Sequence, residues 1–385
     1  MKVIGVTRGL HERPALVIWE LSPDSDPPGP SGSGEAASRA DPDDLTFEER
    51  HRLLPRLTAF GEPLPVLVLA GGHPFPRRDA TALTAEASKL GFPVALASSA
   101  AAALTTEGLE ALQDAGLAGL AVGLDSPDPA IHDGQRGIRG VFDRAMRVIQ
   151  AARALGVPIE IDTRLTRQTL DGLPLLASLV AILGAVRWRV SFPLLPGPPE
   201  GEGSMTPLEC ESTLNDLHDL SLTAPFLVEV AEAPQYRRVI LERRRGIRRD
   251  GRPVWAVASR WPSHLDPLRR VPVGSGKGLL VIDHRGEVHP SPFIRASAGS
   301  VRWASPVAIY RTHPLFRALR DPERLRGRCG RCPFRVVCGG SRARAFTVTG
   351  DPLAEDRLCL FTPCPDPLEA PPNPSLPSGP PLPQP

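Results

Sequence analysis

Residues 65–72 read PVLVLAGG, an unbroken apolar run that ends in two glycines. A short run of this kind, bounded by turn residues, is typical of a buried strand. Comparable runs occur at ALVIWEL (15–21), PVALASS (93–99), LAVGLD (120–125), PIEIDTR (158–164) and VRWRVSF (186–192). These runs predict the strands of one sheet that is buried on both faces.

Segments with helical periodicity lie between these strands, and several of them end at a glycine. The expected helices cover 45–59, 79–90, 105–115, 140–155 and 171–183. Glycine after the last helical residue often takes the left-handed conformation that ends a helix. Strands alternating with helices predict a parallel sheet covered by helices. Six such units predict an α/β fold with a partial (β/α)6 barrel, whose functional site lies at the carboxyl ends of the strands.

The second half of the chain continues this pattern and then changes. We expect a helix at 206–221, a strand at 226–234, a β-hairpin at 279–289 around Arg285-Gly286, and a helix at 305–320. The tail at 365–385 is rich in proline and is predicted to be disordered.

Four of the six cysteines lie close together near the end of the chain, within RCGRCPFRVVCGG (328–340) and its continuation to Cys359. Cys329, Cys332 and Cys338 have the spacing C-x2-C-x5-C, and Gly339-Gly340 allow a tight turn behind the third thiol. Four thiolates bind either tetrahedral zinc or a cluster of four irons and four sulfides. We therefore predict a metal site, with structural zinc as the alternative to the cluster and a disulfide as the less favoured reading.

The segment CGGSRARAF, followed by TGDPLAED and Cys359, resembles the C-terminal SPASM domain of radical S-adenosylmethionine (SAM) enzymes, in particular the tetrapyrrole-maturing branch. The resemblance covers residues 15–362. It implies a 4Fe–4S cluster held by Cys329, Cys332, Cys338 and Cys359. Cys364 competes with Cys359 for the fourth position, and Cys210 reads as a buried small residue.

The family's first cluster motif is missing where the resemblance places it. WEL (19–21) resembles the segment that leads into C-x3-C-x2-C in active relatives, and those cysteine positions fall at Ser25, Gly29 and Gly32. Other parts are kept: Gly71, Gly72 and Asp125 match a vestigial SAM site, with His73 where an acidic residue is usual. We interpret His132 as a surface loop residue. Thr163 and Thr166 are expected to face the barrel mouth.

These features predict five segments. They are an N-terminal extension (1–14), a degenerate radical-SAM-like barrel (15–235), an arginine-rich linker (236–275), a SPASM-like domain (276–364) and the tail (365–385). Arginines are dense at 237–252, which predicts either a solvated face or a site for an anionic substrate or acidic partner. No interleaved aromatic residues support nucleic-acid binding there. Gln235 stands where the family commonly has histidine.

Net charge is only +2 over 385 residues, so bulk electrostatics select no partner. No apolar run reaches the length of a membrane span, and no signal peptide is apparent, so we expect a cytoplasmic protein.

Three hypotheses follow. In the first, the chain is a degenerate homologue that keeps one auxiliary 4Fe–4S cluster, does not cleave SAM, and binds a substrate or an intact radical SAM paralogue. In the second, it is an active maturation enzyme for a tetrapyrrole or a peptide. In the third, it is a zinc-stabilised binding module.

Overall fold

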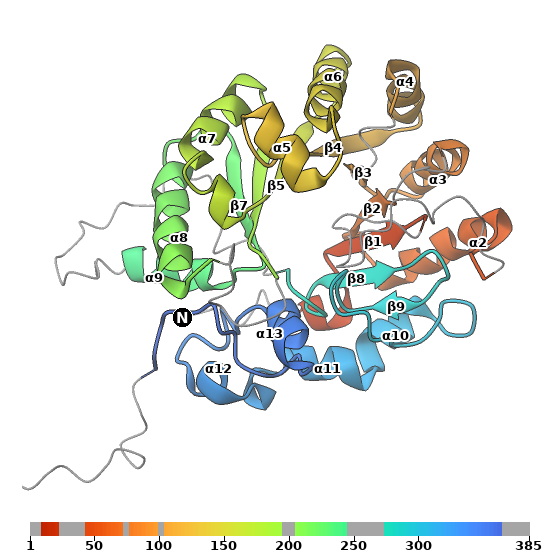
Figure 1. Ribbon diagram of the computed structural model, residues 1–385. Helices are drawn as coiled ribbons and strands as arrows, with labels where there is room; N and C mark the ends of the chain where they lie inside the picture. The colour runs from red at the N-terminus through yellow and green to blue at the C-terminus, as the bar shows by residue number, and fades with distance from the viewer. Residues whose placement is uncertain are drawn as a thin grey trace, which may run out of the picture.

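A nine-stranded sheet forms the centre of the molecule (Figure 1). The structure is a computed structural model that describes residues 9–22, 43–71, 77–98, 104–194, 205–244 and 273–363. The strands follow the order β7-β6-β5-β4-β3-β2-β1-β8-β9. Their bounds are β1 Leu16–Glu20, β2 Val66–Ala70, β3 Val94–Ser98, β4 Leu117–Gly123, β5 Ile159–Arg164, β6 Arg187–Ser191, β7 Leu227–Ala231, β8 Leu279–Ile282 and β9 Val288–His289.

All neighbouring strands from β7 to β8 run parallel, and only β9 pairs antiparallel, with β8. The register places Leu16 beside both Val66 of β2 and Leu279 of β8. The predicted partial (β/α)6 barrel is confirmed, and β7 and β8 extend it at its two edges. Parallel strands place their carboxyl ends at one edge of the sheet, where the polar side chains of several strands can meet.

Helices follow most strands and cover the outside of the sheet (Figure 1). Their bounds are α2 Phe47–Leu57, α3 Arg77–Lys89, α4 Thr106–Asp114, α5 Pro129–Arg136, α6 Val141–Ala154, α7 Leu173–Ile182, α8 Pro207–Ser221 and α9 Gln235–Arg244. The C-terminal helices are α10 Pro306–Thr312, α11 Pro314–Arg320, α12 Gly327–Arg331 and α13 Arg342–Thr349.

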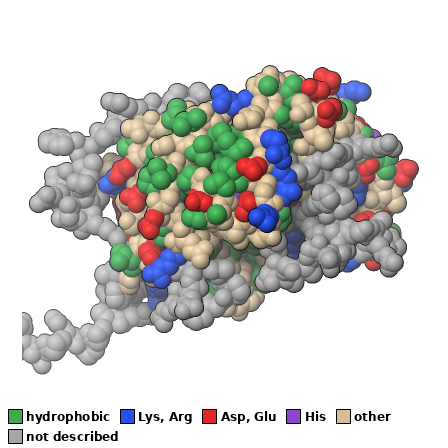
Figure 2. Space-filling view, turned by 45° about the horizontal axis from the view of Figure 1, so that its top comes forward, with side chains coloured by type: hydrophobic (Ala, Val, Ile, Leu, Met, Phe, Trp, Pro, Cys, Tyr) green, Lys and Arg blue, Asp and Glu red, His purple; other side chains and the backbone are tan. Residues whose placement is uncertain are grey.

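The core lies between this helical layer and the sheet. Leu53, Leu54 and Leu57 of α2 are buried, as the helical periodicity of 45–59 predicts. Figure 2, in which the top of Figure 1 is turned forward, shows hydrophobic side chains grouped on the outer surface as well. Leu175 and Ile182 of α7 are both exposed, because this helix is apolar around most of its circumference. None of the described helices is long and apolar enough to cross a membrane.

Three expectations about segments need correction. The helix predicted at 305–320 is two helices, α10 and α11, that meet at His313, because a residue before proline disfavours the helical conformation. The linker predicted from 236 begins later, because 236–244 lie in α9, where Tyr236, Val239 and Ile240 are buried. The hairpin assigned to a separate C-terminal domain continues the barrel sheet, because β8 pairs with β1.

Candidate metal centre

The four cysteines predicted as ligands line one cavity in the C-terminal segment. Cys329 lies in α12, and Cys332 follows at its end. Cys338 precedes the turn into α13, and Cys359 lies beyond that helix. All four thiols are free of disulfides. The competing ligand Cys364 lies outside the described residues.

Main-chain N–H groups donate hydrogen bonds to all four sulfurs. Cys332, Cys338 and Cys359 each accept from the amide two residues further on, at Phe334, Gly340 and Phe361. The Gly340 nitrogen lies 3.4 Å from the Cys338 Sγ. Hydrogen bonds to sulfur stabilise the thiolate charge and tune the potential of a bound cluster.

Cys329 receives its hydrogen bonds from more distant parts of the chain. The N–H of Asp356 lies 3.4 Å from its Sγ, and Nη2 of Arg342 lies 3.7 Å away. The Arg342 guanidinium thus brings a positive charge next to this sulfur.

Burial disfavours the thiolate form of Cys332, Cys338 and Cys359. Desolvation raises the pKa values of Cys332 and Cys338 above the usual thiol range, and it raises the pKa of Cys359 to about 11. Without metal these groups are therefore protonated at neutral pH. Metal binding has to release their protons, so the thiols and the metal are thermodynamically linked.

The arrangement fits a cluster better than a single ion. Among the described residues, no group of three or more His, Cys, Asp or Glu side chains is placed to hold one metal ion. Zinc would require all four sulfurs to converge at about 2.3 Å from one point. A cube of four irons binds each thiolate at a separate corner, so its ligands stand further apart. The four cysteines line one cavity, which suits a cluster that binds each thiolate at its own iron.

Gly340 is the tightest point of this loop. Its φ of +69° lies in the left-handed region, and a Cβ there would come within 2.9 Å of the Cys329 Sγ and 2.8 Å of the Asp356 Cβ. Gly339 also has a positive φ, of +70°. The expectation that this glycine pair turns the chain behind the third thiol is confirmed.

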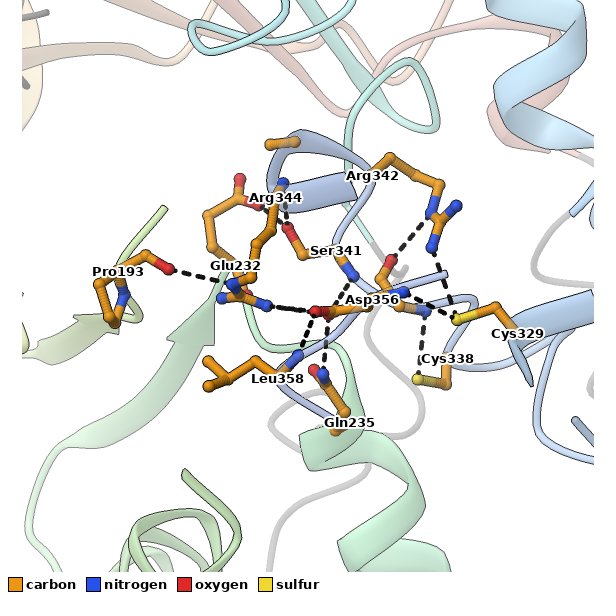
Figure 3. A network of polar contacts seen from close by, with 12 residues as sticks. Pro193, Glu232, Gln235, Cys329, Cys338, Ser341, Arg342, Arg344, Asp356 and Leu358 are labelled. Carbon is orange, nitrogen blue, oxygen red and sulfur yellow. Dashed lines mark hydrogen bonds and ion pairs between the residues drawn. The ribbon is translucent and has the colours of Figure 1, made fainter. Parts of the chain in front are cut away.

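A buried polar network joins the cysteine loop to the barrel (Figure 3). The carboxylate of Asp356 accepts from Arg344 Nη1 at 2.8 and 3.0 Å, from Gln235 Nε2 at 2.8 Å and from the Ser341 N–H at 2.8 Å. Ser341 donates its hydroxyl to Glu232 at 2.7 Å. Glu232 and Gln235, between β7 and the start of α9, therefore contact residues next to the cysteine ligands.

Asp125, predicted for the vestigial SAM site, is fully buried at the end of β4. Its carboxylate accepts from Arg136 Nε at 2.5 Å, from Arg136 Nη2 at 2.9 Å and from the Arg164 N–H at 2.7 Å. Asp125 therefore helps to orient Arg136 and Arg164. Its contact with SAM stays a prediction. Gly71 is described and buried.

The remaining residues of the predicted SAM region, Gly72 and His73, lie outside the described residues, as do Ser25, Gly29 and Gly32, where the resemblance places the first cluster motif.

Two polar residues are placed differently from the expectation. His132 is buried in α5, where Nδ1 accepts from the Asp125 N–H at 3.0 Å, so the surface-loop interpretation is wrong. Thr163 is also buried and bonds the Leu124 carbonyl and the Trp188 indole, at 2.6 and 2.8 Å. It faces the packed side of the sheet and not the mouth, whereas Thr166 begins a short 3-10 turn. Cys210 is buried, as predicted.

Charged side chains of β5, β6 and β7 form a lattice on one face of the sheet. Arg187 and Arg189 alternate with buried Trp188, so they lie on the opposite face from it. Arg187 Nη1 lies 2.9 Å from Glu160, and Arg189 lies 3.0 Å from Glu160 and 3.4 Å from Glu229. This lattice lines the inner side of the barrel.

The described arginines of the 237–252 stretch are mostly engaged within the chain. Arg238 is buried, pairs with Glu211 and Glu242, and lies 5.4 Å over the ring of Phe361. Arg243 pairs with Asp219. Burial lowers the pKa of Arg237 to about 10, against the opposing effect of the Cys338 thiol. Residues 245–252 are outside the described part, so an anion site there stays a prediction.

Sequence reasoning missed Asp356 as a member of the site. It stands in the quoted segment TGDPLAED, but one of its partners is distant in sequence: Gln235 and Asp356 are 121 residues apart. An acidic residue three positions before a cysteine ligand was the available signal.

Comparisons with known proteins support the resemblance. A family model described as the radical SAM superfamily matches residues 30–169. The AdoMet-dependent heme synthase of Oleidesulfovibrio alaskensis is 30% identical over 353 residues, which cover 90% of this chain and 87% of that protein. The enzyme of the same name from Methanosarcina barkeri is 28% identical, over 91% of this chain and 97% of that protein.

Solved structures show the same fold. Streptococcus suis SuiB bound to S-adenosylmethionine matches with a TM-score of 0.64 at 14% identity, over 91% of this chain and 78% of SuiB. The protein anSMEcpe with bound AdoMet and a peptide matches with a TM-score of 0.62 at 13% identity, over 89% and 93%. Sequence identity to the heme synthases over nine tenths of the chain, together with this fold, shows that the chain belongs to the radical SAM superfamily.

Proposed function

We propose that the chain acts in the maturation of a tetrapyrrole as an iron–sulfur protein whose 4Fe–4S cluster is held by Cys329, Cys332, Cys338 and Cys359. The observation that carries this proposal is the set of four thiols lining one cavity, each with an N–H donor to its sulfur. A 4Fe–4S cluster supplies one-electron transfer when bound. The chain's own groups would hold it, shield it from water and set the charge around it.

The relatives favour an enzyme over a purely accessory protein. The heme synthases that match over nine tenths of the chain are named for dependence on AdoMet. That supports the second of the sequence hypotheses, an active maturation enzyme, more than the first. The tetrapyrrole as substrate class also rests on these names, and a peptide is the competing substrate for the test.

Carboxylates are the common polar groups of tetrapyrroles, and arginine is the residue best suited to bind them. Arg136 and Arg164 are held by Asp125 beyond the end of β4. We assign them the role of positioning or binding a substrate carboxylate at the strand ends. Free thiols in such a protein suit a reducing compartment such as the cytoplasm.

A non-cleaving accessory protein is the second candidate, and one specific observation favours it. The first cysteine of the chain is Cys210, so the positions expected to hold the SAM-binding cluster carry no thiol. An iron that binds SAM and reduces its sulfonium would need other ligands. In this form the chain would present a tetrapyrrole to an intact radical SAM paralogue.

One anaerobic preparation separates these candidates. The protein is reconstituted with iron and sulfide, and iron, sulfide and zinc are counted per chain. SAM and an iron-coproporphyrin are then titrated, and 5′-deoxyadenosine is measured under reducing conditions. About four irons with tetrapyrrole binding supports the proposal, and deoxyadenosine formed by the pure chain selects the enzyme.

About four irons and tetrapyrrole binding without deoxyadenosine selects the accessory form. A single zinc with no iron would overturn the cluster and favour the zinc module. Binding of a peptide but of no tetrapyrrole would overturn the substrate class.

A further inference from the structure

Asp356 occupies the junction between the barrel and the cysteine loop (Figure 3). Its side chain is buried and accepts hydrogen bonds from Arg344, Gln235 and the N–H groups of Ser341 and Leu358. Its own N–H donates to the Cys329 Sγ. Asp356 thus links helix α9 of the barrel to the predicted metal ligand Cys329.

Arg344 extends this junction to the ends of two strands. Its Nε donates to the Pro193 carbonyl at 3.0 Å, and its Nη2 donates to the Glu232 carbonyl at 2.5 Å. Pro193 follows β6, and Glu232 follows β7 directly. Nε and Nη2 of Arg344 therefore hold α13 against the carboxyl ends of β6 and β7, while Nη1 holds Asp356.

Glu232 shows that this junction imposes a conformation on the chain. Among the described residues, Glu232 is the non-glycine residue with a positive φ, which is 55°. This left-handed region costs free energy for residues other than glycine. Its carboxylate is bonded by Ser341 and its carbonyl by Arg344. These contacts from the cysteine loop stabilise the turn at the end of β7.

The Asp356 and Arg344 charges lie next to the cluster position in a buried environment. A Cβ on Gly340 would contact both the Asp356 Cβ and the Cys329 Sγ, so the carboxylate-bearing residue packs within the ligand loop itself. Electrostatic interactions are strong where water is excluded. A one-electron reduction adds negative charge to a cluster, so a nearby positive charge favours the reduced form and a negative charge opposes it.

We propose that Asp356 and Arg344 are a positioning pair for the C-terminal cluster: they orient the ligand loop toward the ends of β6 and β7, and their opposed charges set its reduction potential. This inference rests on the proposed function, because it requires that the four cysteines hold the cluster. Neither residue ligates iron in this proposal. They act through Cys329 and through the backbone of the loop.

The test uses the full chain reconstituted anaerobically, with three variants: Asp356→Asn, Arg344→Gln and the double variant. Iron content is measured first, followed by the EPR spectrum of the reduced cluster and a redox titration. Asp356→Asn removes a negative charge and is expected to shift the reduction potential upward. Arg344→Gln removes a positive charge and is expected to shift it downward, and the double variant is expected to return toward the wild-type value.

A merely structural role would not give shifts of opposite sign that cancel. Shifts of the same sign in both single variants, or unchanged potentials and spectra, would overturn the inference while leaving the cluster in place. Should the single variants fail to fold, the double variant keeps the test open, because a potential far from the wild-type value would show that the two charges do not offset each other at the cluster. An iron-free wild-type protein would instead refute the proposed function.

Asp351→Asn is the matched control. Asp351 also pairs with an arginine of the C-terminal segment, Arg326, at 2.8 Å, but that arginine is exposed. Solvent screens this pair. The control variant is expected to keep the wild-type potential and EPR spectrum.

Discussion

Glu20 and Arg295 form a bidentate ion pair between two segments that are far apart in the sequence. The Arg295 Nη1 and Nη2 atoms lie 2.8 and 3.0 Å from the two carboxylate oxygens of Glu20, 275 residues away. Glu20 ends β1, in the WEL segment, whereas Arg295 follows the β8–β9 hairpin. The pair therefore links the first strand of the barrel to the segment that leads into the metal centre.

Arg295→Met is expected to destabilise the protein by about 2 kcal/mol, because it removes two charged hydrogen bonds to a buried carboxylate. Glu20 is only 1% exposed, so water cannot replace the lost hydrogen bonds. Urea unfolding at pH 7, followed by circular dichroism, measures the change. The control Arg311→Met breaks the exposed pair with Glu12 and is expected to cost less than 1 kcal/mol. Equal losses in the two variants would contradict the prediction.

Cys338→Ala is expected to abolish cluster assembly, because it removes a sulfur that faces the shared cavity and accepts the Gly340 hydrogen bond. Iron and sulfide per chain after anaerobic reconstitution are the measurement, with the broad visible absorption of the cluster as a second readout. Cys210→Ala is the control, since Cys210 is a buried helical residue of α8 and not a lining residue of that cavity. Wild-type iron content in Cys338→Ala would refute the ligand assignment.

The fourth ligand can be assigned by a separate pair of variants. Cys359 lines the cavity and has its own N–H donor at Phe361, so Cys359→Ala is expected to lose the four-iron cluster. Cys364→Ala is expected to retain it. The reverse pattern of iron content would move the ligand to Cys364.

Local sequence patterns predict the barrel well. The run around Leu67 is apolar and the run around Val190 alternates apolar with charged residues; both are separated by helical segments, and both side chains are fully buried in strands. The signals for each strand and helix lie within its own residues, so residue propensity and hydrophobic periodicity suffice to predict these elements. The spacing of the four cysteines and the turn at Gly339-Gly340 are also local features, which is why the sequence could select the cysteines that line one cavity.

The rest of the site depends on contacts that no local pattern encodes. His132 appears in a polar segment and reads as a loop residue, yet α5 folds back so that its ring meets the Asp125 N–H. The alternation of side chains along β5 does not say which face of the sheet Thr163 is on. Its hydrogen bond with the buried Trp188 shows that it lies on the packed face. The partners of Asp356 come from α9 and α13, brought together by the closure of the whole sheet.

Glu49 provides a pH-dependent test of how the C-terminal segment is attached to α2. Its carboxylate accepts from Arg302 Nε at 2.9 Å and from Nη2 at 3.1 Å, and it closes the capping box with the Thr46 N–H at 2.8 Å. The Arg302 hydrogen bond, aided by Thr46, lowers the pKa of Glu49 to about 2. The folded protein therefore binds the proton of this group less readily than the unfolded chain does.

Because the folded-state pKa is the lower one, the stabilisation is fully present above the unfolded value of about 4.3 and is lost as the pH falls toward 2. Glu49→Gln is expected to cost about 1 kcal/mol at pH 7, since the partly exposed pair is screened by solvent. The difference in unfolding free energy between wild type and variant is expected to shrink steadily between pH 5 and pH 3. Urea titrations at several pH values measure it, with Glu48→Gln at the neighbouring exposed position as control. A difference that stays constant down to pH 3 would show that the ionised Glu49 does not anchor Arg302.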